Sequence, residues 1–178
     1  MIAVISDSHI GRKAGEIPEK YLEIVSEADL TVHCGDFETR AVYDRLNKLS
    51  NDFIAVMGNC DRFELENYRS FDHGGIAFGV THGKGINPRG DRDTLANIAT
   101  QLDVDVLFNG HTHKQEAVEH NGKLLLNPGS CTGAPGGSYS GGNPEMMIVR
   151  TESPGVLSVE LLELVNGEVS TDTKEFQL

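Results

Sequence analysis

The chain of 178 residues falls within the usual size of one folded domain and is long enough to bury a substantial core, so we expect a single domain over residues 1–178. Its 15 Lys and Arg against 27 Asp and Glu give a formal net charge of -12. Such an acidic surface repels phosphate backbones, which excludes a broad nucleic-acid-coating role. Three cysteines without CxxC spacing argue against a disulfide framework or a zinc ribbon.

The apolar runs of the chain are too short to cross a membrane, so we expect no membrane partner. The first ten residues, MIAVISDSHI, have neither the basic region nor the cleavage site of a signal peptide. We therefore expect a cytoplasmic protein.

The first part of the chain alternates short apolar runs with amphipathic helices. Ile2–Ser6 is apolar at successive positions, which is typical of a central strand buried on both faces. Helices are expected at 18–28 and 39–49, the second with Thr39 as its cap, and strands at 30–34 and 53–57. This alternation predicts a layered α/β fold.

The second part changes from alternating elements to antiparallel strands. A strand at 76–80, a helix at 91–102 and a strand at 104–108 come first, and a hairpin follows. Asn121-Gly122, between the strands 115–119 and 124–126, is a strong hairpin signal. Further strands are expected at 146–149 and 156–164, and the end of the chain, which alternates poorly, is expected to fray.

A glycine-rich stretch interrupts these strands at residues 133–142, where five of the ten residues are glycine. Such a stretch has a high ordering entropy and few apolar contacts. Two interpretations are equally supported: a mobile surface loop, or a flap beside a functional site.

Metal-capable side chains follow five of the expected strands, at the point where each strand ends. In an open α/β sheet, ligands collect beyond the carboxyl ends of the strands, so these side chains are expected to converge. The seven candidates are Asp7, His9, Asp36, Asn59, His82, His111 and His113.

The residue types in this set favour particular ions. Mixed carboxylate and imidazole ligands suit manganese, iron, nickel or zinc better than calcium. Seven ligands are too many for one tetrahedral ion. If Asp36 bridges, however, they divide into four and four around two metals, an arrangement that clamps the attacking and leaving oxygens of a displacement.

Each of these residues also has an interpretation without function. Asp36 would cap the following helix, and Asn59 and Asp61 would form a turn. We apply the structural interpretation to the other histidines, His33 within a strand and His73 and His120 beside turns. Seven strand-end candidates in one small domain favour a common site.

In order along the chain, the motifs Asp7-Ser8-His9, Gly35-Asp36, Gly58-Asn59-Cys60-Asp61, Thr81-His82-Gly83 and Gly110-His111-Thr112-His113 resemble those of the calcineurin-like metallophosphoesterases. Leu126-Asn127-Pro128-Gly129-Ser130 is similar to a loop of their small branch, the YfcE-type phosphodiesterases. The resemblance spans about residues 1–150. It implies a four-layer αββα sandwich, with two packed mixed sheets flanked by helices, and a dinuclear metal site.

The resemblance also implies a role for each ligand. By this resemblance, Asp7, His9 and His113 bind the first metal. The second metal is bound by Asn59, His82 and His111, and Asp36 bridges both. The implied cofactors are two divalent ions, Mn²⁺ first and Ni, Fe, Zn or Co as alternatives. The implied reaction is hydrolysis of a small phosphate ester by a hydroxide that bridges the metals, with Asp36, Asn59 and His82 holding the hydroxide and positioning the phosphate.

One position departs from the wider superfamily, where a histidine that acts as a general acid or phosphate contact follows the asparagine ligand. Here that position is Cys60, as in the closer branch, so the general acid is unassigned. Either good leaving groups are favoured, or metal-bound water protonates the leaving group. Asp61 is expected to orient a ligand histidine or to close the turn.

Two other functions stay open at this point. A retromer subunit resembles this family in fold and serves as an interaction scaffold, and a nuclease or cyclic nucleotide phosphodiesterase would use the same two-metal chemistry. The complete set of seven ligands favours an enzyme over a scaffold, and the absence of basic patches argues against a nuclease. The physiological substrate and homo-oligomerisation are left open.

Overall fold

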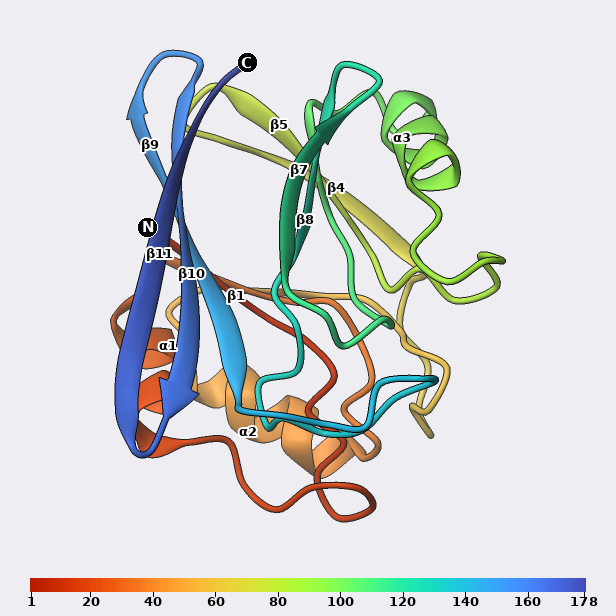
Figure 1. The fold of residues 1–178 in the computed structure, drawn as a ribbon, viewed down its shortest axis with the longest axis vertical. Helices are drawn as coiled ribbons and strands as arrows, with labels where there is room; N and C mark the ends of the chain where they lie inside the picture. The colour runs from red at the N-terminus through yellow and green to blue at the C-terminus, as the bar shows by residue number, and fades with distance from the viewer.

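The structure is a computed structural model that describes all 178 residues as two β-sheets and three α-helices (Figure 1). The six-stranded sheet has the order β11-β10-β9-β1-β2-β3, and the five-stranded sheet the order β4-β5-β6-β8-β7. The first sheet contains β1 (Ile2–Ile5), β2 (Leu30–His33), β3 (Phe53–Ala55), β9 (Glu145–Ser153), β10 (Val156–Val165) and β11 (Glu168–Gln177). The second contains β4 (Tyr68–His73), β5 (Ile76–Thr81), β6 (Val106–Phe108), β7 (Glu116–His120) and β8 (Lys123–Asn127).

The helices are α1 (Glu19–Glu27), α2 (Arg40–Leu49) and α3 (Arg92–Gln101). Residues of α1 and α2 pack against the six-stranded sheet, and residues of α3 pack against the five-stranded sheet. Between the two sheets lies the largest apolar cluster. The helices therefore flank two packed mixed sheets, which confirms the expected four-layer sandwich. None of the three helices has the length and apolar character needed to span a membrane.

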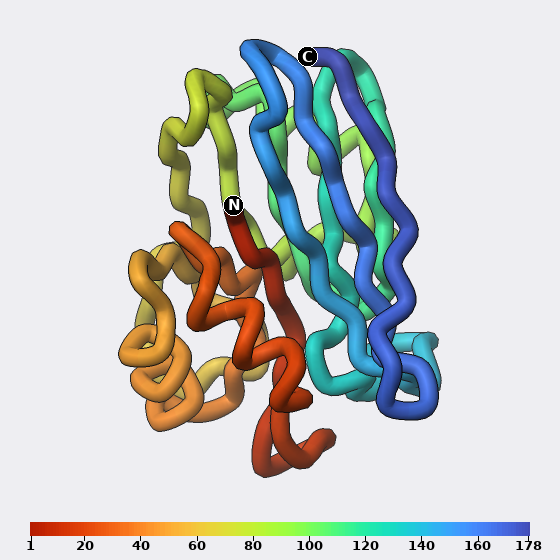
Figure 2. The backbone as a smooth tube through the Cα atoms, turned by 90° about the vertical axis from the view of Figure 1, so that its left-hand side faces the viewer, coloured from red at the N-terminus to blue at the C-terminus, as the bar shows by residue number.

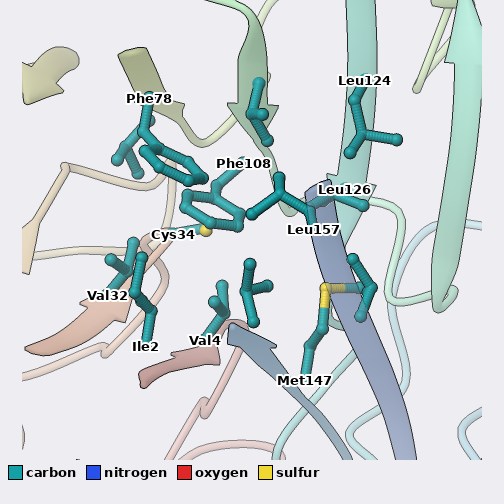
Figure 3. Close-up of a cluster of buried hydrophobic side chains, with 14 of the residues drawn as sticks. Ile2, Val4, Val32, Cys34, Phe78, Phe108, Leu124, Leu126, Met147 and Leu157 are labelled. Carbon is teal, nitrogen blue, oxygen red and sulfur yellow. The ribbon is translucent and has the colours of Figure 1, made fainter. Parts of the chain in front are cut away.

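The side chains of β1 explain why this strand is apolar on both faces. Ile2 and Val4 point into the cluster between the sheets, where they face Phe78 and Phe108 (Figure 3). The alternate residue Ile5 belongs instead to the cluster under α1 and α2. Because β1 lies at the centre of its sheet with layers on both sides, each successive residue is buried, as its sequence predicts.

Two tight hairpins carry the same Asn-Gly signal. Asn121-Gly122 joins β7 to β8, as predicted, and Asn166-Gly167 joins β10 to β11. All four residues have positive φ, from 50° to 81°, which is the backbone that a two-residue hairpin requires. The second hairpin corrects the expectation of a frayed end, because β11 pairs with β10 along its whole length (Figure 2). Its polar composition reflects an exposed edge strand rather than disorder.

Three further details differ from the sequence-based expectations. The edge strand β4 was not predicted, because its side chains are mostly exposed and give no apolar signal. Thr39 does precede α2 as its cap residue, but its side chain makes no capping hydrogen bond. Asp91, by contrast, caps α3 by accepting a hydrogen bond from the backbone N–H of Thr94 at 3.0 Å.

Candidate metal centre

The site forms where loops from both sheets meet. The parallel pairing of β1 and β2 continues past the strand ends, since the N–H of Asp7 donates to Gly35 and that of His9 donates to Asp36. The backbone there is unusual, because six residues other than glycine have positive φ between 45° and 79°. Such left-handed residues are costly and cluster at functional sites. They are Asp7, His9, Asp36, Glu38, His111 and His113.

The first group of side chains contains Asp7, His9 and His113, all buried. The Nε2 atoms of His9 and His113 lie 3.2 Å apart, and Asp7 Oδ1 lies 3.2 Å from His113 Nε2. Asp7 Oδ1 has no hydrogen-bond partner, although its carboxylate is buried. The three residues predicted for the first metal are thus brought together.

The second group surrounds His82. Its Nε2 atom lies 3.1 Å from Asn59 Oδ1 and 3.2 Å from His111 Nδ1. Asp36 lies between the two groups, because its Oδ2 atom is 3.4 Å from His82 Nε2 and also 3.4 Å from His9 Nε2. All seven sequence-predicted ligands therefore converge, with the one predicted to bridge in the middle.

Hydrogen bonds on the outer side of the rings fix which nitrogen faces inward. The Nδ1 atom of His113 lies 2.7 Å from the carbonyl oxygen of Ala134, and that of His82 lies 2.7 Å from the carbonyl oxygen of Cys34. A carbonyl only accepts, so each Nδ1 carries a proton, and in the neutral ring each Nε2 presents a lone pair to the centre.

His9 follows the same pattern, with Nδ1 2.8 Å from the carboxylate of Glu38. The inward-facing atoms are therefore ring lone pairs, carboxylate oxygens and an amide oxygen, packed 3.1–3.4 Å apart. Acceptors that converge without a donor between them repel one another unless a cation lies among them. The donor set consequently fits divalent metal ions.

Glu38 is a residue of the site that the sequence analysis did not single out. It is buried, has a φ of 79° and orients His9; its Oε2 atom, which has no hydrogen-bond partner, lies 3.7 Å from Arg12 Nη1. A carboxylate behind a ligand histidine fixes the tautomer and raises the basicity of the ring. The spacing Asp36-x-Glu38 repeats that of Asp7-x-His9, which is the signal that was available in the sequence.

Asp61 closes the turn after β3. Its carboxylate accepts hydrogen bonds from the backbone N–H groups of Gly58, Asp36, Phe37 and Glu38, at 2.6–3.1 Å. Of its two expected roles, the structure supports turn closure, and Asp61 contacts no ligand histidine. It ties the loop after β2 to the loop after β3, which places Asp36 beside Asn59.

Cys60 lies beside the carboxylate of Asp36. Its backbone N–H donates to Asp36 Oδ1 at 2.7 Å, and its thiol lies 3.2 Å from the amide nitrogen of Asn59. Burial and the nearby carboxylate raise the pKa of Cys60 to about 11. The thiol is therefore neutral at neutral pH, which argues against a thiolate nucleophile.

Burial and neighbouring charges set the protonation of the other groups. Burial opposes ionisation of Asp36, but His82 and the Cys60 N–H outweigh it and hold the pKa of Asp36 below its usual range. Burial, with His82 and Arg89 adding to it, lowers the pKa of His111 to about 4. Asp36 is thus an anion and His111 a neutral ring, the forms in which both bind metals.

The remaining histidines lie outside the centre, as expected. His33 is buried and stacks on Phe37 with ring centroids 3.6 Å apart, and burial lowers its pKa to about 3. His73 ends β4 beside a turn, and His120 pairs with Asp93 at 2.7 Å.

The glycine-rich segment 133–142 lies beside the centre, which is the position that the flap interpretation requires. The carbonyl of Ala134 accepts from the ring of His113, and Gly136 covers the same ring. A Cβ atom at Gly136 would lie 2.4 Å from His113 Nε2, so only glycine permits this approach. The predicted loop 126–130 also reaches the site, because Ser130 Oγ donates to the carbonyl of Asp7 at 2.7 Å.

Comparisons with known proteins show the family of this chain. Residues 1–153 match the calcineurin-like phosphoesterase superfamily domain. A probable metallophosphoesterase of Methanocaldococcus jannaschii is 39% identical over 132 residues, which cover 74% of this chain and 68% of that protein.

Two solved structures extend the likeness to nearly the whole chain. Vps29 of Entamoeba histolytica, solved with Zn²⁺, is 32% identical, with a TM-score of 0.88 over 98% of each chain. A predicted phosphoesterase of Streptococcus pneumoniae TIGR4 shares the fold, with a TM-score of 0.75 at 22% identity over 99% of this chain and 97% of that one. This chain therefore belongs to the calcineurin-like metallophosphoesterase superfamily.

Proposed function

We propose that this protein is a divalent-metal-dependent phosphodiesterase whose substrate is a small phosphate ester. The observation that carries the proposal is the position of Asp36 between two groups of inward-facing acceptors, 3.4 Å from the nearest ring nitrogen of each. Seven ligands arranged around one shared carboxylate are what a two-metal hydrolase needs.

The ligand roles follow from this grouping. Asp7, His9 and His113 would hold one cation, Asn59, His82 and His111 the other, and Asp36 both. When bound, such a pair supplies Lewis-acid stabilisation of phosphoryl oxygens and lowers the pKa of water. We propose Mn²⁺ as the native ion, with Ni²⁺, Fe²⁺, Zn²⁺ and Co²⁺ as alternatives.

The protein's own residues prepare the site for that chemistry. Glu38, Ala134 and Cys34 keep three rings in the tautomer that presents Nε2 inward, so little reorganisation accompanies binding. Asp61 fixes the loops that carry Asp36 and Asn59, which sets where the phosphate of the substrate would be positioned.

The same surroundings suggest the kind of ester. With its pKa raised to about 11, Cys60 is a poor general acid near neutral pH, and no other acid replaces the superfamily's histidine at that position. Esters whose leaving group departs without strong protonation are therefore favoured. With its charge of -12 the chain suits a small substrate rather than a nucleic acid, and we retain the cytoplasm as its expected location.

The experiment is an activity screen on chelated protein. Each of Mn²⁺, Ni²⁺, Fe²⁺, Zn²⁺ and Co²⁺ is added back, with bis(p-nitrophenyl) phosphate, p-nitrophenyl phosphate and a cyclic nucleotide as substrates. We expect metal-dependent hydrolysis, fastest with the aryl diester. Asp36→Asn is expected to lower kcat/KM by about 10³-fold or more, since it removes charge from both groups. Full activity in that variant would contradict the mechanism.

A second measurement tests the division of the ligands. His111→Ala and His113→Ala are each expected to lose activity, and metal analysis of the two purified variants is expected to show loss from different positions. Differential loss is visible when the two positions are loaded with spectroscopically distinct ions, such as Co²⁺ and Zn²⁺. Identical losses in both variants would contradict the assignment to two centres.

The likeness to Vps29 favours a second candidate function, a protein-binding scaffold of the same fold. The complete ligand set argues for the enzyme, because a scaffold has no need of seven converging acceptors. The screen separates the two: a scaffold would bind Zn²⁺ or Mn²⁺ without hydrolysing any of the three substrates.

A further inference from the structure

Arg89 is one of two arginines in this acidic protein that have no carboxylate partner. Of the eight arginines, six form salt bridges, and only Arg62 and Arg89 do not. Lys114 is also free, since Lys20 is the one lysine with a carboxylate within 4.0 Å. Eight of the fifteen Lys and Arg side chains have no carboxylate partner, but only two of these eight are arginines.

Of these cations, Arg89 and Lys114 lie next to the metal centre. Arg89 Nη1 is 3.4 Å from the carbonyl oxygen of the ligand His111, and Lys114 directly follows the ligand His113. The guanidinium also reaches the glycine-rich segment, where a Cβ atom on Gly137 would lie 2.9 Å from Arg89 Nη1. Arg89 therefore spans from the loop after β6 to the flap that covers His113.

Two hollows open between these cations. The smaller, of about 110 Å³, is lined by Arg89, Thr112, Lys114, Gly136 and Ser138. The larger, of about 330 Å³, shares Arg89, Thr112 and Lys114 and continues toward α3. Their shared wall is positively charged and polar, and the smaller hollow has no hydrophobic residue in its lining.

The larger hollow also contains Arg92 and Glu116, which neutralise each other at 2.5 Å. No carboxylate lines the smaller hollow, so Arg89 and Lys114 set its charge. A guanidinium fork, an ammonium group and the hydroxyls of Thr112 and Ser138 are all donors toward an anion with several oxygens. A phosphate group has that chemistry.

We propose that Arg89 and Lys114 form a subsite for a second phosphate group carried by the substrate. The inference rests on the proposed function and narrows it: the preferred substrates are phosphodiesters that bear an additional phosphomonoester. The diester binds at the metal centre, and the additional phosphate binds in the smaller hollow. The subsite involves none of the seven metal ligands.

A matched pair of chromogenic substrates tests the subsite. Thymidine 5′-(p-nitrophenyl phosphate) and its 3′-phosphorylated counterpart have the same scissile bond and differ only in the additional phosphate. With wild-type protein loaded with Mn²⁺, we expect kcat/KM to be about 10- to 100-fold higher for the 3′-phosphorylated compound, which corresponds to one or two charge-assisted hydrogen bonds.

Variants then assign that preference to residues. Arg89→Ala is expected to reduce the ratio of the two kcat/KM values at least tenfold, and Arg89→Lys to keep part of it, because an ammonium group retains the charge but not the fork. Lys114→Ala is expected to have a smaller effect. Arg62→Ala is the matched control, an exposed arginine without a salt bridge that lines neither hollow, and should leave the ratio unchanged.

The outcomes separate this inference from the proposed function. If wild-type protein hydrolyses both compounds at equal kcat/KM, or if Arg89→Ala lowers both equally, the subsite is wrong while the phosphodiesterase stands. If neither compound nor the aryl diester is hydrolysed with any metal, the proposed function itself fails. Metal content of Arg89→Ala, measured alongside, shows whether a loss common to both substrates comes from the neighbouring His111.

Discussion

The loops at the strand ends and the C-terminal strands differ in backbone conformation and in the side chains that they bury. In the loops, where six residues have left-handed backbone, buried carboxylates and imidazoles lie within 3.2–3.4 Å of one another. In β9, β10 and β11 the pairing is a long antiparallel ladder (Figure 2). Apolar residues of this ladder such as Leu157 are buried in the core.

The contrast shows how one small fold combines stability with strain. Buried like charges and left-handed residues lower the stability of the loops, whereas the sheets and their three apolar clusters raise it. Stability and function therefore reside in different residues, and substitutions in one region should be separable from those in the other.

The largest effect is expected from a substitution in the apolar cluster between the sheets. Leu157→Ala in β10 removes a fully buried side chain from the cluster between the sheets and should lower the free energy of unfolding by about 3 kcal/mol. Metal affinity of the folded protein should not change. Urea unfolding measures the free energy of unfolding and metal titration measures the metal affinity, with exposed Thr173→Ala in β11 as control. Weaker metal binding in folded Leu157→Ala would contradict the inference that stability and metal binding reside in different residues.

Metal addition tests the strained region. Cations placed among converging acceptors remove the repulsion that the folded chain otherwise contains, so saturating Mn²⁺ should stabilise the protein. At a concentration of about 100 Kd the gain is about 2.7 kcal/mol, or about 5–10 °C in Tm for a chain of this size. Thermal unfolding with chelator and with Mn²⁺ measures it, and Asp36→Asn should show a smaller shift. An unchanged Tm would mean that the acceptors do not form a cation site.

Substitution of Glu38 tests whether residues that contact the candidate ligands from behind contribute to metal affinity. Glu38→Ala removes the acceptor of His9 Nδ1 and should weaken metal binding about 10- to 100-fold, with Glu38→Gln intermediate because its amide oxygen still accepts. Competition with a chromogenic chelator measures the affinity. Exposed Glu64→Gln is the control, and an affinity equal to wild type in Glu38→Ala would remove Glu38 from the site.

The smallest effect concerns a carboxyl group away from the ligands. Burial, with Glu163 adding to it, raises the pKa of Glu145 from its ordinary 4.5 to about 7. Because the pKa of Glu145 is higher in the folded protein than in the unfolded chain, its carboxyl group contributes most to stability below about pH 4.5, and that contribution is lost as the pH rises through about 7.

Glu145→Gln should therefore gain stability relative to wild type between about pH 5 and about pH 8, by about 1 kcal/mol once partial exposure is taken into account. Urea unfolding in chelator at both pH values measures the difference, and exposed Glu175→Gln in β11 serves as control. An equal change in both variants would contradict the shift.

Particular residues show what could be predicted from the sequence. The convergence of the seven candidate ligands was predictable because strand-end position and residue type are both local signals, and parallel strands bring their carboxyl ends together. Glu38 was missed because a lone Glu after a strand is common and its role depends on packing against His9. The edge strands β4 and β11 carry little apolar pattern, since their pairing comes from backbone hydrogen bonds.

The bare backbone of Gly136 against His113 has an evolutionary consequence. Any side chain there would collide with a ligand ring, so that position resists change, whereas Ser138, two residues further on, borders the hollow without touching a ligand. Relatives can thus vary the surface around the hollow by exchanging residues near the tip of this segment while inheriting an intact set of candidate metal ligands.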